Sequence, residues 1–179
     1  LVNVSAEERK KALVDYALPK NIKKMQADME KYKIFYDKWF FESELHKSGA
    51  VKAVVDLLTK KGLTYEKDGA VWYKNKEVLT QKLLKEGKSQ KYIDNLELKD
   101  DVLIRQNGNP TYFTADIAYH KNKFDRGFTT LIDVWGADHH GHVMRMKGAM
   151  DAIGYDGDKL NVVLMQLVKL VKDGELVKM

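Results

Sequence analysis

Apolar residues recur at helical spacing in the first third of the chain. Ser5 and Glu8 form a capping-box pattern ahead of an apolar stripe, which predicts a helix that begins there and ends at Pro19. The same spacing predicts a second helix over residues 21–33 and a third over 48–61. We therefore expect this part of the chain to be mostly helical.

An aromatic block, IFYDKWFF at residues 34–41, separates the second and third predicted helices. Aromatic rings bury a large apolar area, so packing in a core or an interface is the interpretation we favour. Such rings also stack on nucleic-acid bases, so a base-stacking platform is the alternative.

Strand-like patterns begin at Leu63. Asp68-Gly69 lies between two β-rich runs and predicts a β-hairpin. Residues 77–96 return to helical spacing, with Gly87 as a break, which predicts two short helices.

Two further turn signals follow. Asn107-Gly108 predicts a second hairpin, although Pro110 makes the returning strand an edge strand or delays its start. Asp173-Gly174 predicts a final hairpin in LVKLVKDGELVKM.

The last third alternates between helical and strand patterns. We expect a helix over residues 116–123, a strand over 130–135, a helix over 141–153 and a buried strand over 161–165. A strand–helix–strand order implies a right-handed crossover and a parallel sheet, with ligands bound beyond the carboxyl ends of the strands.

Composition narrows the class of protein. The 179 residues are 44% hydrophobic, enough for a core, and contain no cysteine, which excludes disulfides, thiolate metal sites and cysteine nucleophiles. We see no apolar run of membrane-spanning length and no signal sequence, and expect a cytoplasmic protein with no membrane partner.

The net charge of +5 is unevenly placed. Residues 1–101 hold 21 basic and 17 acidic side chains, whereas residues 102–179 hold 10 and 9. A basic first part is compatible with a module that binds RNA or another partner without catalysis. Solvated helix faces are the interpretation that we favour.

A polar cluster, GADHHGH at residues 136–142, directly follows a predicted strand and opens a helix. Glycine allows close approach of a ligand to the backbone, a helix N-terminus attracts phosphate, and a carboxylate accepts from ribose hydroxyls. A metal-dependent hydrolase built on the three histidines is a weaker alternative, because side chains at this spacing do not all converge.

A second group contains Tyr112 and Asp116, which share a helix face if a helix begins near Phe113. A phenol and a carboxylate together suit a cationic ligand, and a carboxylate matches the fork of a guanidinium. The alternative makes Asp116 a helix-start residue and Tyr112 a core residue.

Long segments of the chain resemble one family. TYFTADIAYHKNKFDRGF, WGADHHGHVMRMKGAM and LMQLVKLVKDGELVKM resemble the later half of the catalytic domain of bacterial arginyl-tRNA synthetases. NVSAEERKKAL, FYDKWFFESELHKSG and YEKDGAVWYK resemble the part inserted between the halves of the nucleotide-binding fold of that family. The resemblance is weakest over residues 74–101.

This resemblance implies an α/β fold of class I synthetase type. Residues 1–101 would form the inserted connective subdomain, mostly helical with a hairpin, and residues 102–179 the second half of a Rossmann-like catalytic domain. It also implies ATP-dependent attachment of arginine to tRNA(Arg), with Mg²⁺ accompanying the nucleotide and no tightly bound metal. We expect the complete enzyme to be a monomer.

The resemblance also implies roles for individual residues. Arginine would be bound by Tyr112, Asp116 and His139. ATP would be bound by Gly136, Ala137, Asp138, His139 and Gln166. Lys178 and Met179 would begin a catalytic loop of KMSKS type.

The chain departs from the family pattern in ways that bear on its activity. No HIGH-type motif precedes these segments, and the letters of His139 to His142 do not supply one, because they belong to the GADHHG context. The KMSKS-type loop is cut at Met179. We therefore expect a catalytic fragment that is inactive alone and whose open sheet promotes instability or self-association.

Overall fold

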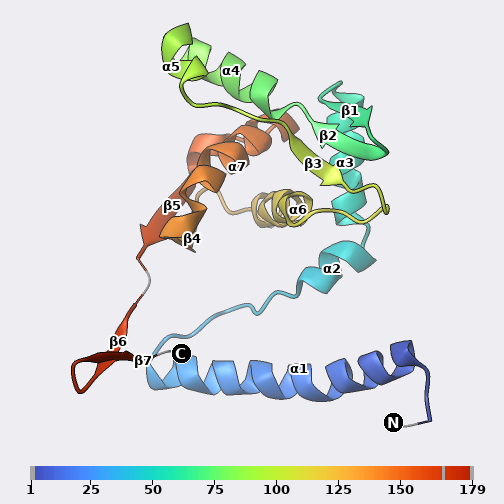
Figure 1. The fold of residues 1–179 in the computed structure, drawn as a ribbon, viewed down its shortest axis with the longest axis vertical. Helices are drawn as coiled ribbons and strands as arrows, with labels where there is room; N and C mark the ends of the chain where they lie inside the picture. The colour runs from blue at the N-terminus through green and yellow to red at the C-terminus, as the bar shows by residue number, and fades with distance from the viewer. Residues whose placement is uncertain (1–2, 167, 178–179) are drawn as a thin grey trace. The chain divides into compact units, whose positions relative to one another are not determined.

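Figure 1 shows the computed structural model of the chain, which describes residues 3–166 and 168–177. The architecture mixes helices with strands, as predicted. The chain divides into a first unit that ends at Phe40 and a second that begins at Phe41. In the parts that the structure describes, no helix is both long and apolar enough to cross a membrane.

The first unit contains one long helix, α1 (Ala6–Lys31). The predicted capping box is confirmed: the Ser5 hydroxyl accepts from the Glu8 amide at 3.2 Å, and the Glu8 carboxylate accepts from the Ser5 amide at 2.9 Å. The predicted end at Pro19 is wrong, because α1 continues through it. Proline removes one backbone donor, but this helix buries no residue, so its ring meets no packed neighbour.

The aromatic block at residues 34–41 forms neither helix nor strand up to Phe40. The side chains of Phe35 and Tyr36 are 74% and 57% exposed, and Tyr36 contacts Trp39 edge-on at 5.5 Å. The exposed rings are not core residues of the structure. An interface role and a base-stacking role both stay predictions.

The second unit opens with α2 (Glu42–Lys47) and α3 (Ala50–Lys60). Gly49, at φ 76°, separates them, so the predicted helix over residues 48–61 begins slightly later than expected. The predicted apolar stripe of α3 is buried at Val51, Val54 and Leu58.

The predicted hairpin at Asp68-Gly69 is confirmed. Strands β1 (Thr64–Lys67) and β2 (Ala70–Tyr73) pair antiparallel around these two residues, whose φ angles are 52° and 71°. Two successive positive φ angles are typical of the tight turn that matches the twist of a hairpin. Helices α4 (Asn75–Lys85) and α5 (Gln90–Asp94) follow, separated at Gly87 as predicted.

The predicted second hairpin at Asn107-Gly108 is reduced to a turn. Strand β3 (Asp101–Ile104) pairs antiparallel with β2, giving the order β1-β2-β3, and the returning chain makes a single bridge between Ile104 and Pro110. Pro110 has no N–H for a ladder, and a helix starts at once after it. Pairing with a distant strand therefore replaces the local hairpin.

Helix α6 (Tyr112–Asp125) is longer than predicted. Its N-cap is Thr111, whose hydroxyl accepts from the Thr114 amide at 3.4 Å and donates to the Val102 carbonyl at 2.8 Å. The Thr114 hydroxyl donates to the Leu103 carbonyl at 2.8 Å. These bonds join the start of α6 to β3.

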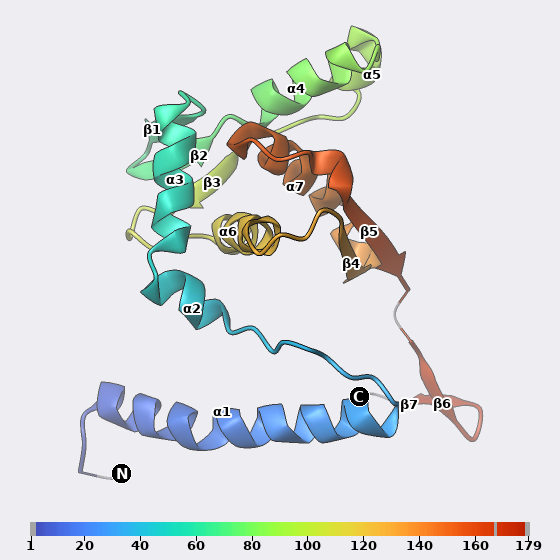
Figure 2. The ribbon, with the colours of Figure 1, turned by 180° about the vertical axis from the view of Figure 1, so that it is seen from behind.

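The predicted parallel sheet is confirmed. Strands β4 (Leu131–Gly136) and β5 (Leu160–Met165) pair in parallel, connected by the short helix η1 (Ala137–His139), α7 (His140–Ile153) and η2 (Gly157–Lys159). Figure 2 shows α6 and α7 beside this sheet, with α3 on the far side of α6. The fully buried side chains of this unit include Leu58, Tyr73, Leu79, Ile117, Met146 and Leu160.

The prediction that the strand over residues 161–165 is buried is wrong, because Asn161, Val163 and Met165 are exposed and the other two side chains are only half-buried. Burial alternates along both strands, and one face is open: Ile132, Val134, Val163 and Met165 are 69%, 67%, 45% and 54% exposed. Apolar runs predict strands buried on both faces, but here α6 and α7 pack against one face.

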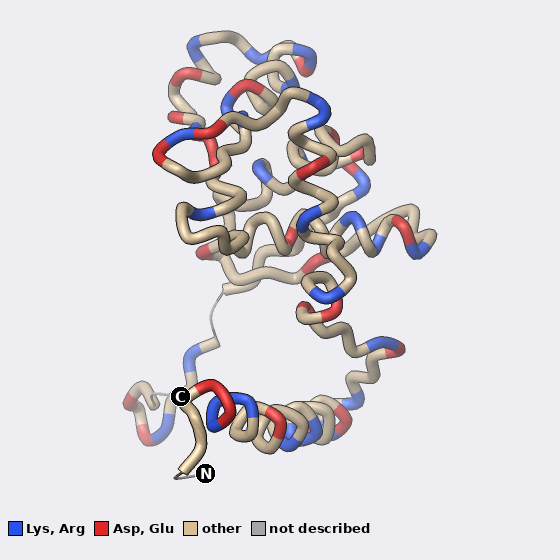
Figure 3. The backbone as a smooth tube through the Cα atoms, turned by 90° about the vertical axis from the view of Figure 1, so that its right-hand side faces the viewer, with Lys and Arg blue, Asp and Glu red and all other residues tan. Residues whose placement is uncertain are grey.

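The last predicted hairpin is confirmed as β6 (Leu170–Lys172) and β7 (Glu175–Val177). Its turn residues, Asp173 and Gly174, have φ angles of 54° and 85°. Figure 3 shows basic and acidic residues interspersed along the chain, a pattern typical of solvated faces rather than of a basic stripe.

Candidate functional site

The carboxyl ends of β4 and β5 lie side by side, because Gly136 pairs with Met165 at the last position of the ladder. Ala137 to His139 continue directly from β4 as η1, and the exposed Gln166 continues from β5. The structure thus brings the five residues predicted to bind nucleotide to one edge of the sheet.

At this edge, Gly136 allows the Asp138 side chain to approach the backbone closely. A Cβ atom at this position would lie 2.4 Å from the Asp138 carboxylate, so that carboxylate folds back over the glycine backbone. The Asp138 side chain is 75% exposed and lies 3.8 Å from the imidazole of His139, which is 60% exposed. Both side chains are available to a ligand.

The three neighbouring histidines do not converge. His139 and His140 are exposed, whereas the His142 ring turns inward between Phe113 at 5.5 Å and Trp135 at 5.2 Å. Within residues 3–166 and 168–177, no three histidine, aspartate or glutamate side chains gather as metal ligands do.

Tyr112 and Asp116 both lie on α6, four residues apart and therefore on one face of the helix. Tyr112 is 77% exposed and the Asp116 side chain 47% exposed. Because Thr111 caps the helix and Tyr112 is exposed, the alternative of a helix-start aspartate beside a core tyrosine is wrong.

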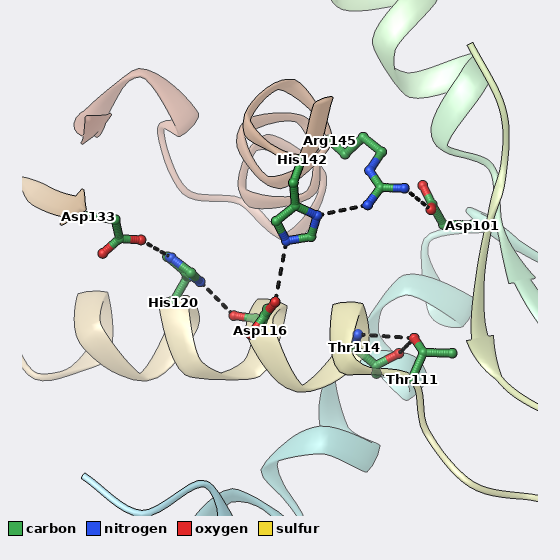
Figure 4. A network of polar contacts seen from close by, with 8 residues as sticks. All are labelled: Asp101, Thr111, Thr114, Asp116, His120, Asp133, His142 and Arg145. Carbon is green, nitrogen blue, oxygen red and sulfur yellow. Dashed lines mark hydrogen bonds and ion pairs between the residues drawn. The ribbon is translucent and has the colours of Figure 1, made fainter. Parts of the chain in front are cut away.

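A chain of polar contacts connects Asp116 to β3 (Figure 4). The Asp116 carboxylate lies 3.3 Å from His142 Nε2, and the Arg145 guanidinium lies 2.8 Å from His142 Nδ1. The other arm of Arg145 donates to Asp101 at 2.6 Å. Burial raises the pKa of the Asp101 carboxyl, and the nearby Arg145 offsets this only in part.

Sequence reasoning missed this contribution of Arg145 and Asp101. The spacing of His142 and Arg145, three residues apart on a predicted helix, was the available signal for a shared face. Asp101 comes from a strand whose pairing with β2 is non-local, so no local pattern placed it here.

A second polar cluster, also missed, lies under the sheet. His120 Nε2 contacts the Asp133 carboxylate at 2.5 Å, its Nδ1 contacts the Asp116 backbone carbonyl at 2.7 Å, and Lys123 donates to Asp133 at 2.7 Å. Both ring nitrogens of His120 therefore face oxygen acceptors.

The His120 imidazole and the Lys123 ammonium therefore both contact one carboxylate that is 8% exposed. Burial acts to raise the pKa of Asp133, but the hydrogen bonds from His120 and Lys123 outweigh burial and lower it. This cluster connects α6 to β4 and holds the helix that carries Asp116 against the sheet. Its sequence signal was an aspartate at an inward position of an apolar strand.

The predicted catalytic residues Lys178 and Met179 lie outside the described residues. Their role in a KMSKS-type loop stays a prediction.

Curated relatives match almost the whole chain, although no family model matches. The arginine–tRNA ligase of Caldanaerobacter subterraneus subsp. tengcongensis is 53% identical over 178 residues, and that of Ruminiclostridium cellulolyticum is 50% identical over 179 residues. Each match covers 99% of this chain but only 29% of the relative.

Solved structures agree with these relatives. A crystal structure described as an arginyl-tRNA synthetase from Campylobacter jejuni superposes with a TM-score of 0.76 at 36% identity, over 97% of this chain and 34% of that one. A Thermus thermophilus arginyl-tRNA synthetase gives a TM-score of 0.67 at 18% identity, over 89% of this chain and 32% of its own, which shows likeness of fold alone. Over nearly its whole length the chain is therefore homologous to a segment of the arginine–tRNA ligases, the family that its motifs indicate.

Proposed function

We propose that this chain supplies the arginine-binding and ATP-binding part of an arginine–tRNA ligase, which activates arginine with ATP and transfers it to tRNA(Arg) in the cytoplasm. The observation that carries the proposal is the half-exposed Asp116 carboxylate, one helical turn from the exposed Tyr112. It lies 3.3 Å from His142, whose ring packs against Trp135 near the carboxyl end of β4.

The chemistry of this pair suits the arginine side chain. A carboxylate accepts two parallel hydrogen bonds from a guanidinium, and the exposed phenol ring offers a surface on which a cation is favourable. Lysine lacks the planar fork, so this geometry selects arginine. We also propose that His139 contacts the bound arginine, because its exposed side chain is accessible to a ligand.

The nucleotide would lie at the edge formed by the ends of β4 and β5. Glycine at residue 136 leaves room for the Asp138 carboxylate against the backbone, and this exposed carboxylate would accept from ribose hydroxyls. Gln166 and Ala137 complete this edge. Mg²⁺ would enter with the nucleotide.

We propose the class I assignment at the level of domains as well. The β4–α7–β5 unit has the parallel crossover that a Rossmann-like half requires, and residues 102–179 would form that half. Residues 1–101 would form the inserted subdomain. Strand β3, at the boundary between them, pairs with β2 and so joins the two regions through one sheet.

A chimera tests this proposal directly. In it, this chain replaces the matching segment of the Caldanaerobacter ligase, which supplies the remaining 71% of the length of that relative. With tRNA(Arg) present, we expect arginine-dependent exchange of pyrophosphate into ATP. A folded chimera that binds ATP yet shows no arginine-dependent exchange would contradict the proposal.

Asp116→Asn tests the arginine contact in the same chimera. Loss of the charge partner should raise the KM for arginine by about tenfold or more, which corresponds to about 1.4 kcal/mol. The matched control is Asp125→Asn, on the same helix α6 but paired with Lys121, and it should leave this KM unchanged. Equal KM values for arginine in the wild type and Asp116→Asn would show that Asp116 does not bind the arginine side chain.

A further inference from the structure

The His142 ring is held in a fixed orientation beside Asp116. Phe113 on α6 packs edge-on against it with ring centroids 5.5 Å apart, and Trp135 on β4 packs against it at 5.2 Å. The side chain is 15% exposed. An aromatic ring enclosed in this way keeps its two nitrogens pointed at defined neighbours.

Those neighbours determine where the ring carries its proton. Arg145 is always protonated and has donors only, and its Nη2 lies 2.8 Å from His142 Nδ1. Nδ1 must therefore accept, which leaves the single proton on Nε2. The bond between Arg145 and Asp101, 2.6 Å long, holds the guanidinium in this position.

The Nε2 atom faces Asp116. It is buried, has no partner of full hydrogen-bond geometry among the described residues, and lies 3.3 Å from the Asp116 carboxylate. Figure 4 shows this contact between α7 and α6. At this distance the carboxylate lies within reach of a proton on Nε2.

We propose that His142 is a positioning residue for Asp116, acting as a neutral donor at Nε2. This inference rests on the proposed role of Asp116 in binding arginine. A neutral donor orients the carboxylate without cancelling its charge, so the full charge is left for the guanidinium of the substrate. A charged imidazolium in the same place would compete with that guanidinium for Asp116.

Two substitutions separate this role from simple packing. In His142→Gln, the amide nitrogen takes the place of Nε2 and still donates to Asp116. In His142→Asn, the amide oxygen takes the place of Nδ1 and still accepts from Arg145, but the side chain no longer reaches Asp116. Both remove the imidazole ring from its contacts with Phe113 and Trp135.

The affinity of the 179-residue chain for arginine is measured by NMR titration. We expect His142→Asn to raise the dissociation constant by about fivefold or more and His142→Gln by less than about twofold. Equal losses in the two variants, or a larger loss in His142→Gln, would overturn the positioning role. The wild type and Asp116→Asn, titrated alongside, test the proposed arginine site itself.

A second readout needs no arginine. The ¹⁵N shifts of the His142 ring at pH 7 should show a protonated Nε2 and an unprotonated Nδ1, and the Asp116 carboxyl ¹³C resonance should move in His142→Asn but not in His142→Gln. In Arg145→Met, the ¹⁵N shifts of the His142 ring should no longer show a preference for the tautomer protonated at Nε2. A ring protonated at Nδ1, or an Asp116 resonance that does not move in His142→Asn, would overturn the inference even if arginine binds. A wild type that binds no arginine but keeps both signals would overturn only the proposed function.

Discussion

At the scale of single residues, the strongest constraint on the site lies beneath it. Asp133 is 8% exposed and accepts from both His120 and Lys123, and His120 also donates to the backbone of Asp116. Disruption of a buried carboxylate that is paired with a lysine and a histidine is costly, because removal of its charge leaves both partners without their acceptor. The position of α6, and with it of Asp116, depends on this cluster.

Asp133→Asn should lower the free energy of unfolding by about 3 kcal/mol, the usual size of the effect when one partner of a buried ion pair is lost. Urea denaturation measures this change. The control is Asp56→Asn, which breaks the exposed pair between Lys52 and Asp56 and should change stability by less than about 1 kcal/mol. Equal small effects of the two substitutions would show that the Asp133 cluster does not hold α6.

The same residue makes stability depend on pH with a definite sign. The pKa of Asp133 is lowered in the folded state, so the unfolded chain binds the proton more readily. Its contribution is fully present above the ordinary aspartate pKa of about 3.9 and is lost as the pH falls through the lower folded value. The raised pKa of Asp101 acts in the opposite direction.

A comparison of the wild type with Asp133→Asn separates this effect from that of Asp101, which is common to both. The difference in their unfolding free energies should shrink as the pH falls below about 5. Urea denaturation across this range measures it. A difference that grows on acidification would contradict a lowered pKa of Asp133 in the folded state.

At the scale of elements, sequence patterns predicted correctly those structures that depend only on neighbouring residues. The turns at Asp68-Gly69 and Asp173-Gly174 formed hairpins, because two residues with positive φ are enough to reverse the chain. Asn107-Gly108 carries the same signal, but β3 finds its partner in β2. At Pro19 a predicted helix end did not form, because the helical pattern on both sides outweighs the one backbone hydrogen bond that proline cannot donate.

The residues of the candidate site likewise fall into those that the sequence could predict and those that it could not. Tyr112 and Asp116 were predictable as a pair because they are one helical turn apart, and residues 136–139 because they follow a strand. The contacts of Asp101 with Arg145 and of His120 with Asp133 join different elements. Such contacts follow from tertiary packing, which no single stretch of sequence encodes.

Gly69→Ala tests the hairpin turn. The φ angle of Gly69 is 71°, which side chains disfavour, and a Cβ atom there would lie 3.2 Å from the Gln106 side chain. The expected loss is about 1 kcal/mol in the free energy of unfolding, measured with urea. Gly141→Ala is the control, because Gly141 lies in α7 with open space around its Cβ position, and alanine should stabilise that helix by about 0.5 kcal/mol or more.

At the scale of the whole molecule, the parallel sheet is the exposed feature of the second unit. Among the described residues it has two strands, and the apolar side chains on its open face include Ile132 and Val134, at 69% and 67% exposed, beside Val163 on β5. Open edges and an apolar face on a short sheet favour association with other chains. We therefore expect the 179-residue chain to self-associate reversibly as its concentration rises.

Sedimentation velocity between about 5 and 200 µM measures this association, with thermal unfolding followed at the same concentrations. Val134→Lys places a charge in the middle of the open face, at a position where no core contact is lost, and should shift the chain toward the monomer without lowering its melting temperature by more than a few degrees. Lys121→Ala, remote from that face on α6, keeps the wild-type association and controls for a general change in surface charge. A wild-type chain that sediments as a monomer throughout the range and melts sharply at a temperature independent of concentration would show that the open face does not drive association.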